Sequence, residues 1–236
     1  MPNTYFSFKN FTVQQEYCAM KVCTDSCIFG AWAGPEKKEE KMNVLDIGTG
    51  TGLLSLMLAQ RFENIFIDAV EIDVAATKQA TENFANSPWI HRLNAIHADI
   101  QHFSGAKKYD FIICNPPFFH KYLKSPDENI NKARHVHSMD ENVLIKLIDQ
   151  LVSPKGRFAL MLPFVRREIY IQTAEKMGWF PLKELWLQQT PAHIYFRLMV
   201  QFEKKAAITT IQKICIKEMD NHYSDSYYEL MKDYLR

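Results

Sequence analysis

Apolar residues in the middle of the chain follow two patterns that alternate along the sequence. Short runs rich in β-branched residues are typical of buried strands, and longer stretches with apolar residues every three or four positions are typical of helices. The pattern predicts strands over residues 43–48, 65–72, 92–100, 110–115, 157–163, 182–189 and 194–204. It predicts helices over residues 53–62, 75–85 and 141–152. This alternation indicates an α/β protein with a parallel sheet of βαβ units.

The end of the chain departs from this alternation. The last two predicted strands are separated only by residues 190–193, and so short a link joins antiparallel neighbours. The sequence therefore predicts a mostly parallel, seven-stranded sheet with an antiparallel hairpin toward the C-terminus. Residues 1–35 are rich in aromatic side chains and show no regular pattern. A charged linker separates them from the core, which we expect to span residues 43–236 of a single domain, residues 1–236.

A glycine-rich turn follows the first predicted strand. Gly48, Gly50 and Gly52 stand where this strand ends and a helix begins, so the backbone can approach a ligand and direct free N–H groups at it. The turn alone does not specify a cofactor. The dinucleotide fingerprint GxGxxG would need glycine at position 53, where the chain has Leu53, and this disfavours NAD.

Carboxylates mark the ends of the next two strands. Glu71 ends the second strand, where an acid can accept both ribose hydroxyls of an adenosyl group, although Asp73 competes for this role. Asp99 ends the third strand, where its side chain would accept the exocyclic amine of an adenine or cap a helix. Parallel strands end at one edge of a sheet, so we expect these groups to share a crevice.

The fourth strand ends in Asn115, Pro116, Pro117 and Phe118. An amino group conjugated to an aromatic ring is a poor nucleophile because its lone pair is delocalised. The Asn115 side-chain oxygen and the Pro116 carbonyl can each accept one N–H of such an amine, which offsets the positive charge developing on nitrogen. Proline fixes φ and thus the direction of the carbonyl, and Phe118 can stack on a flat base. This corner predicts N-methylation of a planar substrate, and the simpler alternative is an asparagine-led turn.

The chain resembles the S-adenosylmethionine-dependent class I amino-methyltransferases in four motifs and in their order along the sequence. These motifs are residues 44–52, Glu71, Asp99 and the segment 115–118. Residues 8–33, 132–138 and 222–235 are similar to the bacterial tRNA1(Val) adenine-N6 methyltransferase family, so the resemblance runs nearly the whole length. It implies a Rossmann-like fold with helices on both faces of the sheet. It also implies methyl transfer to the exocyclic N6 of an adenine in tRNA, adenine 37 on the 3′ side of the anticodon.

The resemblance also implies where ligands bind. Residues 1–35 should cover the cofactor, S-adenosylmethionine, and Ser26 stands where the family often has glycine. The residues expected at the cofactor are Lys21, Thr24, Asp25, Asp46, Gly48, Thr49, Gly50, Gly52, Glu71, Ile72, Asp99, Ile100 and Asn115. Those available to RNA are Lys132, Arg134, His135, Arg166 and Arg167. His135 and His137 are only two candidate ligands, so no metal site is expected.

Composition adds the distribution of charge. The chain has 236 residues, of which 47% are hydrophobic, and a net charge of +1. Residues 36–110 carry 8 Lys and Arg against 11 Asp and Glu, whereas residues 155–205 carry 9 against 4. The second region would attract a polyanion such as tRNA, unless its charges are simply solvated.

Cysteine usage and hydropathy indicate the compartment. The five cysteines form no CxxC pair, which favours free thiols in a reducing compartment. The N-terminus has no signal-peptide pattern, and no apolar run reaches the roughly 18 residues of a membrane span. We therefore expect a soluble, cytoplasmic protein without a membrane partner or an obligate protein partner.

Other functions remain open from the sequence. The same chemistry would serve an rRNA base, a DNA adenine or the glutamine amide of a protein. A catalytically inert RNA-binding module is the alternative of another class, which an intact Asn115 and Phe118 disfavour. An NAD oxidoreductase is disfavoured by Leu53.

Overall fold

The computed structural model describes residues 3–18, 20–36, 40–105, 107–116 and 140–235. Several residues that the sequence assigns to catalysis, RNA or a possible metal lie outside these ranges, namely Pro117, Phe118, Lys132, Arg134, His135 and His137.

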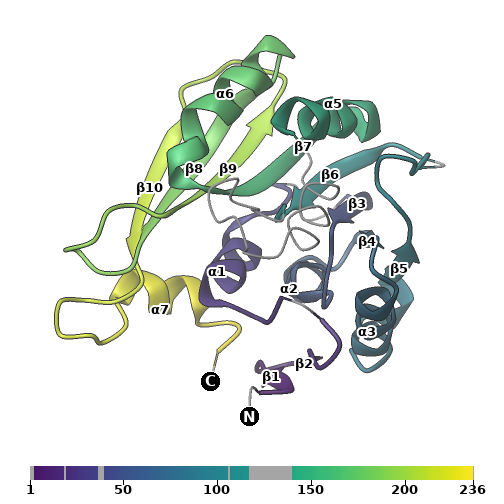
Figure 1. Ribbon diagram of the computed structural model, residues 1–236, viewed down its shortest axis with the longest axis horizontal. Helices are drawn as coiled ribbons and strands as arrows, with labels where there is room; N and C mark the ends of the chain where they lie inside the picture. Colours follow the sequence, from purple (N-terminus) through teal and green to yellow (C-terminus); the bar gives the residue numbers. More distant parts are fainter. Residues whose placement is uncertain (1–2, 19, 37–39, 106, 117–139, 236) are drawn as a thin grey trace, which may run out of the picture.

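An eight-stranded sheet runs through the molecule in the order β10-β8-β9-β7-β6-β3-β4-β5 (Figure 1). Its strands are β3 (Met42–Ile47), β4 (Ile65–Glu71), β5 (Leu93–His97), β6 (Tyr109–Cys114), β7 (Val152–Pro163), β8 (Phe180–Gln188), β9 (Arg197–Glu203) and β10 (Thr210–Cys215). Strands β3 to β7 pair in parallel, and β9 is antiparallel to both β7 and β8. The predicted fold class is confirmed, including the antiparallel hairpin β8–β9.

The sheet has one strand more than the seven that the sequence predicts. The additional strand, β10, pairs in parallel with β8 at the edge of the sheet. Only Ile214 among its residues is fully buried. An edge strand that exposes most of its side chains lacks the apolar pattern by which buried strands are recognised.

Helices cover both faces of the sheet and enclose two hydrophobic cores (Figure 1). One face is covered by α1 (Thr24–Trp32), α2 (Leu53–Arg61), α3 (Val74–Ala85) and α7 (Asp225–Met231), and the other by α5 (Glu141–Leu151) and α6 (Arg167–Lys176). Successive residues of the central strands serve opposite faces, so Val44 and Phe111 lie in the first core and Leu45 and Ile112 in the second. Burial on both faces explains why these strands read as continuous apolar runs.

Residues 1–35 contain regular structure that the sequence did not predict. Strands β1 (Tyr5–Ser7) and β2 (Thr12–Gln14) form an antiparallel pair, and seven of the nine residues of α1 are buried. Phe8 and Phe11, between the two strands, stack with ring centroids 4.5 Å apart in the first core. Three-residue strands and a helix buried almost all round leave no periodic pattern in the sequence.

The C-terminal segment completes the same face of the molecule. The Tyr234 hydroxyl donates to the carbonyl of Met57 at 2.9 Å, and the backbone N–H of Lys9 donates to the carbonyl of Tyr234 at 2.8 Å. All five cysteines are free thiols, as the sequence predicts. No helix in the described part of the chain is long and apolar enough to cross a membrane.

Candidate active site at the carboxyl edge of the sheet

Four parallel strands end at one edge of the sheet, as expected. Ile47 of β3 is level with Val70 of β4 and with Cys114 of β6, and Glu71 is level with His97 of β5. The segments that follow these strands therefore lie side by side, although long stretches of sequence separate them.

The glycine turn after β3 has a left-handed backbone. Gly48, Gly50 and Gly52 have φ values of +68°, +56° and +82°. A Cβ atom at Gly52 would lie 2.5 Å from the ring of Phe84, so this position needs glycine for space as well as for conformation. A Cβ at Gly48 or Gly50 would have no atom within 4 Å in the described structure, so open space adjoins the turn.

Asp46 supports this turn from inside the core. Its fully buried carboxylate accepts hydrogen bonds from the Thr49 and Ser55 hydroxyls at 2.6 and 2.7 Å, both at Oδ2. Its Oδ1 is buried and has no hydrogen-bond partner among the described residues. Burial raises the pKa of Asp46 to about 6, against the lowering effect of the two hydroxyls. Ser55 lies in the first turn of α2, and the sequence analysis did not identify it.

Glu71 binds the outer side of the same turn. Its carboxylate accepts the backbone N–H groups of Gly50 at 2.9 Å, Ile72 at 2.9 Å and Asp73 at 3.0 Å. Asp73, the competing acid, accepts instead from Ala76 N at 2.7 Å and caps α3. Of the two acids, Glu71 is therefore the one at the glycine turn.

After β5, Asp99 begins a turn, and no helix follows it within the described residues 100–105 for Asp99 to cap. The Asp99 carboxylate accepts from the Gln101 N–H at 2.9 Å and lies 3.2 Å from Nδ1 of His102. Beyond β4, Ile72 is 46% exposed, and Ile100 is partly buried against the second core. Ile72 and Ile100 thus provide apolar surface beside the acids.

Asn115 lies at the end of β6 and contacts α1. Its Nδ2 donates to the Ser26 hydroxyl at 3.3 Å, while its Oδ1 is buried and has no partner among the described residues. Ser26 in turn lies 3.0 Å from Sγ of Cys23. The structure thus brings Ser26 to Asn115, a pairing of residues 89 positions apart that no local sequence pattern signals.

The N-terminal residues that the sequence assigns to the cofactor separate into different environments. Asp25 forms an ion pair with Arg197 at 2.8 Å, and the Lys21 ammonium donates to the carbonyl of Gln15. Thr24 lines a cavity between α1 and α7. Cys18, however, is buried within electrostatic range of Glu71: burial first, and then the Glu71 charge, raise the pKa of its thiol to about 11. That this segment covers a cofactor stays a prediction.

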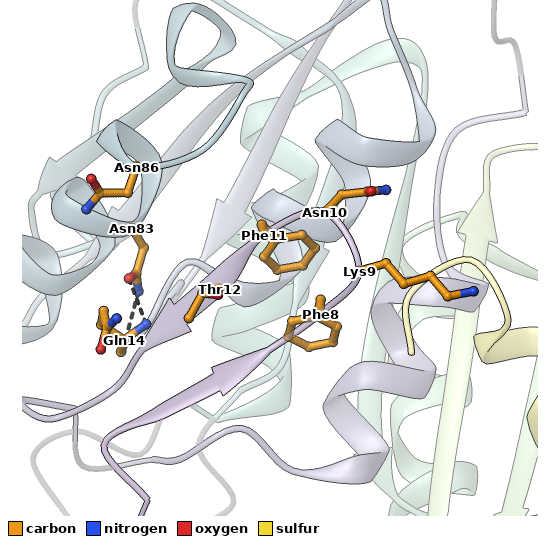
Figure 2. Close-up of a pocket in the computed structure, with 8 residues that line it drawn as sticks. All are labelled: Phe8, Lys9, Asn10, Phe11, Thr12, Gln14, Asn83 and Asn86. Atoms are coloured by element: carbon orange, nitrogen blue, oxygen red, sulfur yellow. Dashed lines mark hydrogen bonds between the residues drawn. The ribbon is translucent and has the colours of Figure 1, made fainter. Parts of the chain in front are cut away.

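Asn83, which the sequence analysis missed, ties the N-terminal hairpin to the glycine turn. Figure 2 shows it beside Gln14 in a cavity of about 330 Å³ between β2 and α3. Its Nδ2 donates to the carbonyls of Gln14 and Thr51, both at 2.8 Å, and its Oδ1 accepts the Gln14 N–H at 2.8 Å. Asn83 is only 1% exposed, and these three bonds connect β2, α3 and the glycine turn.

Arg166 and Arg167 both form ion pairs, but the two pairs differ in how deeply they are buried. Arg166 pairs with Glu141 at 2.7 Å and remains 45% exposed. Arg167 binds both carboxylate oxygens of Glu184, at 2.8 and 2.7 Å, and the Glu184 side chain is fully buried. The Arg167 guanidinium is thus part of a buried ion pair. The described residues hold no cluster of three or more His, Cys, Asp or Glu side chains suited to a metal ion.

The chain is similar to a family of methyltransferases and to individual members of it. The Methyltransferase small domain family matches residues 35–137. A tRNA1(Val) (adenine(37)-N6)-methyltransferase of Dyadobacter fermentans is 44% identical over 86% of this chain and 83% of its own length. Proteins of the same name from Tolumonas auensis and Phocaeicola vulgatus are 39% and 38% identical and cover 98% and 99% of the chain, and 97% and 98% of their own lengths.

Solved structures show the same fold at low identity. A predicted O-methyltransferase from Agrobacterium tumefaciens has a TM-score of 0.68 at 14% identity, over 88% of this chain and 95% of its own. The mitomycin 7-O-methyltransferase MmcR has a TM-score of 0.53 at 14% identity, over 77% and 54% of the two chains. The fold is thus the Rossmann-like class I methyltransferase fold. From its relatives over nearly its full length, this chain belongs to the tRNA1(Val) (adenine(37)-N6)-methyltransferase family.

Proposed function

We propose that this protein transfers a methyl group from S-adenosylmethionine to the exocyclic N6 of adenine 37 in tRNA1(Val), and that it recognises the anticodon stem-loop. The observation that carries the proposal is the Oδ1 atom of Asn115, a buried acceptor without a partner among the described residues. An unpaired buried acceptor costs about 1–3 kcal/mol. A substrate N–H at the same edge as the glycine turn would satisfy it.

The residues at this edge fit the cofactor. Open space adjoins Gly48 and Gly50. A carboxylate offers about four acceptor positions, and Glu71 uses three of them for backbone N–H groups. One position remains for a ribose hydroxyl, so binding of both hydroxyls would require Glu71 to release one N–H. Exposed Ile72 offers a flat apolar surface beside it. When bound, S-adenosylmethionine supplies an electrophilic methyl group.

Asn115 would hold the amine of the adenine. Its bond to Ser26 fixes the rotation of the amide and leaves Oδ1 as the acceptor for one N–H of the substrate. A preorganised acceptor of this kind stabilises the positive charge that develops on N6 during attack. The Pro116 carbonyl is the proposed second acceptor, and Phe118 the proposed stacking surface for a base flipped out of its RNA stack. A tRNA substrate also places the enzyme in the cytoplasm.

The test is methylation of tRNA from a bacterial strain that lacks this modification. The protein is incubated with methyl-labelled S-adenosylmethionine and this tRNA, in parallel with rRNA, DNA and protein from the same strain. Nucleoside analysis should find N6-methyladenosine at position 37 of tRNA1(Val). Label on a ring nitrogen or a ribose, or only in the other macromolecules, would refute the proposal.

A further inference from the structure

A second cavity of about 490 Å³ lies between α1, α7 and the N-terminal hairpin. Phe6, Cys27 and Met231 line part of it with apolar surface, and α7 belongs to the tyrosine-rich segment 222–235. The cavity lies outside the glycine turn and the Asn115 corner. Its volume falls within the roughly 300–1,000 Å³ typical of small-ligand sites.

Three tyrosines form one side of the cavity. Tyr223 and Tyr227 stack with ring centroids 4.6 Å apart and an interplanar angle of 15°, and Tyr228 meets Tyr223 edge-on at 6.0 Å. Tyr227 is buried, whereas Tyr223 and Tyr228 remain 42% and 58% exposed. Exposed rings beside a buried stack offer flat surfaces on which a further planar ring can stack.

The charges around the cavity suit one nucleotide rather than a long polyanion. Lys9 and Lys232 line the cavity, no acidic residue does so in the described structure, and Lys217 lies 5.6 Å above the Tyr223 ring. Lys9 donates to the carbonyl of Lys232, and the Lys232 ammonium pairs with Glu229 at 2.5 Å. Net attraction for phosphate is therefore modest, and stacking would supply most of the affinity.

The first turn of α1 connects this cavity to the catalytic corner. Cys23 and Thr24 line the cavity, and the Cys23 sulfur lies 3.0 Å from the Ser26 hydroxyl. The same hydroxyl accepts from Asn115 Nδ2 at 3.3 Å. Cys23 thus lines the cavity and also contacts the hydroxyl that binds Asn115, the residue proposed to hold the target amine.

We propose that this cavity binds a nucleoside adjacent to the target adenine in the RNA, with its base stacked on Tyr228 and lying edge-on to Tyr223. This subsite rests on the proposed function, because it needs RNA at the Asn115 corner. Flipping one base out of the stack deprives its neighbours of a stacking partner, and the tyrosines replace that partner. The cavity would thus help to hold the loop open while Asn115 holds the amine.

The test pairs changes in the protein with changes in the RNA. Affinity for an anticodon stem-loop RNA is measured for the wild type, Tyr223→Ala, Tyr228→Ala and the two phenylalanine variants at the same positions. Tyr228→Ala should bind about 5- to 100-fold more weakly, the range for loss of a base–aromatic stack, and Tyr223→Ala should weaken binding by less because it removes an edge-on contact. The phenylalanine variants should stay close to the wild type. Tyr5→Ala is the matched control, because Tyr5 is a 53% exposed tyrosine on β1.

A series of RNAs, each abasic at one loop position, identifies the base concerned. When the abasic position is the one whose base stacks on Tyr228, the wild type should bind that RNA more weakly than the intact RNA. Tyr228→Ala, which already lacks the stack, should bind the two RNAs equally well. The proposal is overturned if the alanine variants bind every RNA with the affinity of the wild type. It is also overturned if each variant binds every RNA, intact or abasic, more weakly than the wild type by the same factor. Unchanged circular dichroism and thermal melting show that the variants are folded. If the wild type makes N6-methyladenosine but shows no such coupling, only the subsite fails, whereas the absence of that product refutes the function.

Discussion

The two halves of the sheet use charged side chains in different ways. Around β3 and β4, the carboxylates of Asp46, Glu71 and Asp73 accept hydrogen bonds from groups at most 21 residues away in sequence. Around β7 to β9, arginines pair with carboxylates at separations that include 17 residues for Arg167 and Glu184 and 172 residues for Arg197 and Asp25. The three carboxylates of the first half therefore hold the nearby glycine turn and the start of α3, whereas Arg197 in the second half joins segments that are distant in sequence.

The ion pairs around β7 to β9 change what the excess of basic residues in 155–205 implies about tRNA binding. Residues 155–205 carry nine basic residues, and five of them form ion pairs in the structure: Arg157, Arg166, Arg167, Arg197 and Lys204. Four of the partner acids come from outside the region, namely Asp25, Glu36, Glu141 and Asp149. Neutralised arginines attract a polyanion less than their number suggests. Attraction of tRNA to this region stays a prediction, and the ion pairs weaken its basis.

The largest effect is expected from Arg167→Ala. Removal of this guanidinium leaves the buried Glu184 carboxylate with the Trp186 indole N–H, which donates to it at 2.6 Å, but without its positively charged partner. Breaking a buried ion pair costs about 3–5 kcal/mol. Urea unfolding of the two variants measures the difference. Arg166→Ala is the matched control, because Arg166 is 45% exposed and its ion pair with Glu141 is expected to contribute less than about 1 kcal/mol. Equal stability of the two variants would show that burial of Glu184 gives the Arg167 pair no larger role in stability than the Arg166 pair.

The next effect is a pH dependence that arises from Asp46. Its folded pKa is about 6, whereas the unfolded value is about 3.9. Between these values the folded chain retains a proton that the unfolded chain has lost. This contribution to stability is therefore complete below about pH 4, is lost as the pH rises, and is constant above about pH 6.

Unfolding of the wild type and Asp46→Asn from pH 4 to pH 7 measures this contribution. The stability of the wild type relative to the variant should fall by about 3 kcal/mol over this range, which corresponds to two pKa units. Groups that titrate in both proteins contribute equally to their stabilities, so these contributions cancel in the difference. A difference that does not change with pH would show that Asp46 is ionised throughout.

Asn115→Ala should lower the rate of single-turnover methylation by about 10²-fold, the scale for removal of a preorganised polar group. The residue lies between the two halves, so this change tests the chemistry apart from their stability. Asn86→Ala is the control, since Asn86 is an exposed amide at the end of α3. An Asn115→Ala enzyme as fast as the wild type would disprove the assigned mechanism.

The smallest effect is expected at the acid of the glycine turn. Glu71→Ala should weaken binding of S-adenosylmethionine by about 1.5–3 kcal/mol, as for other hydrogen bonds to a charged group. Asp73→Ala should instead cost about 1 kcal/mol of stability through loss of the α3 cap, with near-normal cofactor affinity. Calorimetric titration distinguishes the two, and the reverse result would assign the ribose to Asp73.

The sequence by itself determined most of the central sheet, the glycine turn and the order of polar groups at the strand ends. These features depend on strand periodicity and on backbone conformations that particular residues favour, and both are local properties of the chain. The same locality explains the errors. β1, β2 and α1 in residues 1–35 and the edge strand β10 have no periodic apolar pattern, so they appear only when they pack against the rest of the molecule.

Only the tertiary structure decided which side chains meet. Three sets of contacts join elements that are adjacent only after folding. They are the bond between Ser26 and Asn115, the three bonds of Asn83, and the pairing of Arg167 with buried Glu184. The resemblance assigns Thr24 to the cofactor, which stays a prediction, and the structure places Thr24 on the lining of the cavity between α1 and α7. Side-chain contacts depend on strand order and helix packing, which no single stretch of sequence encodes.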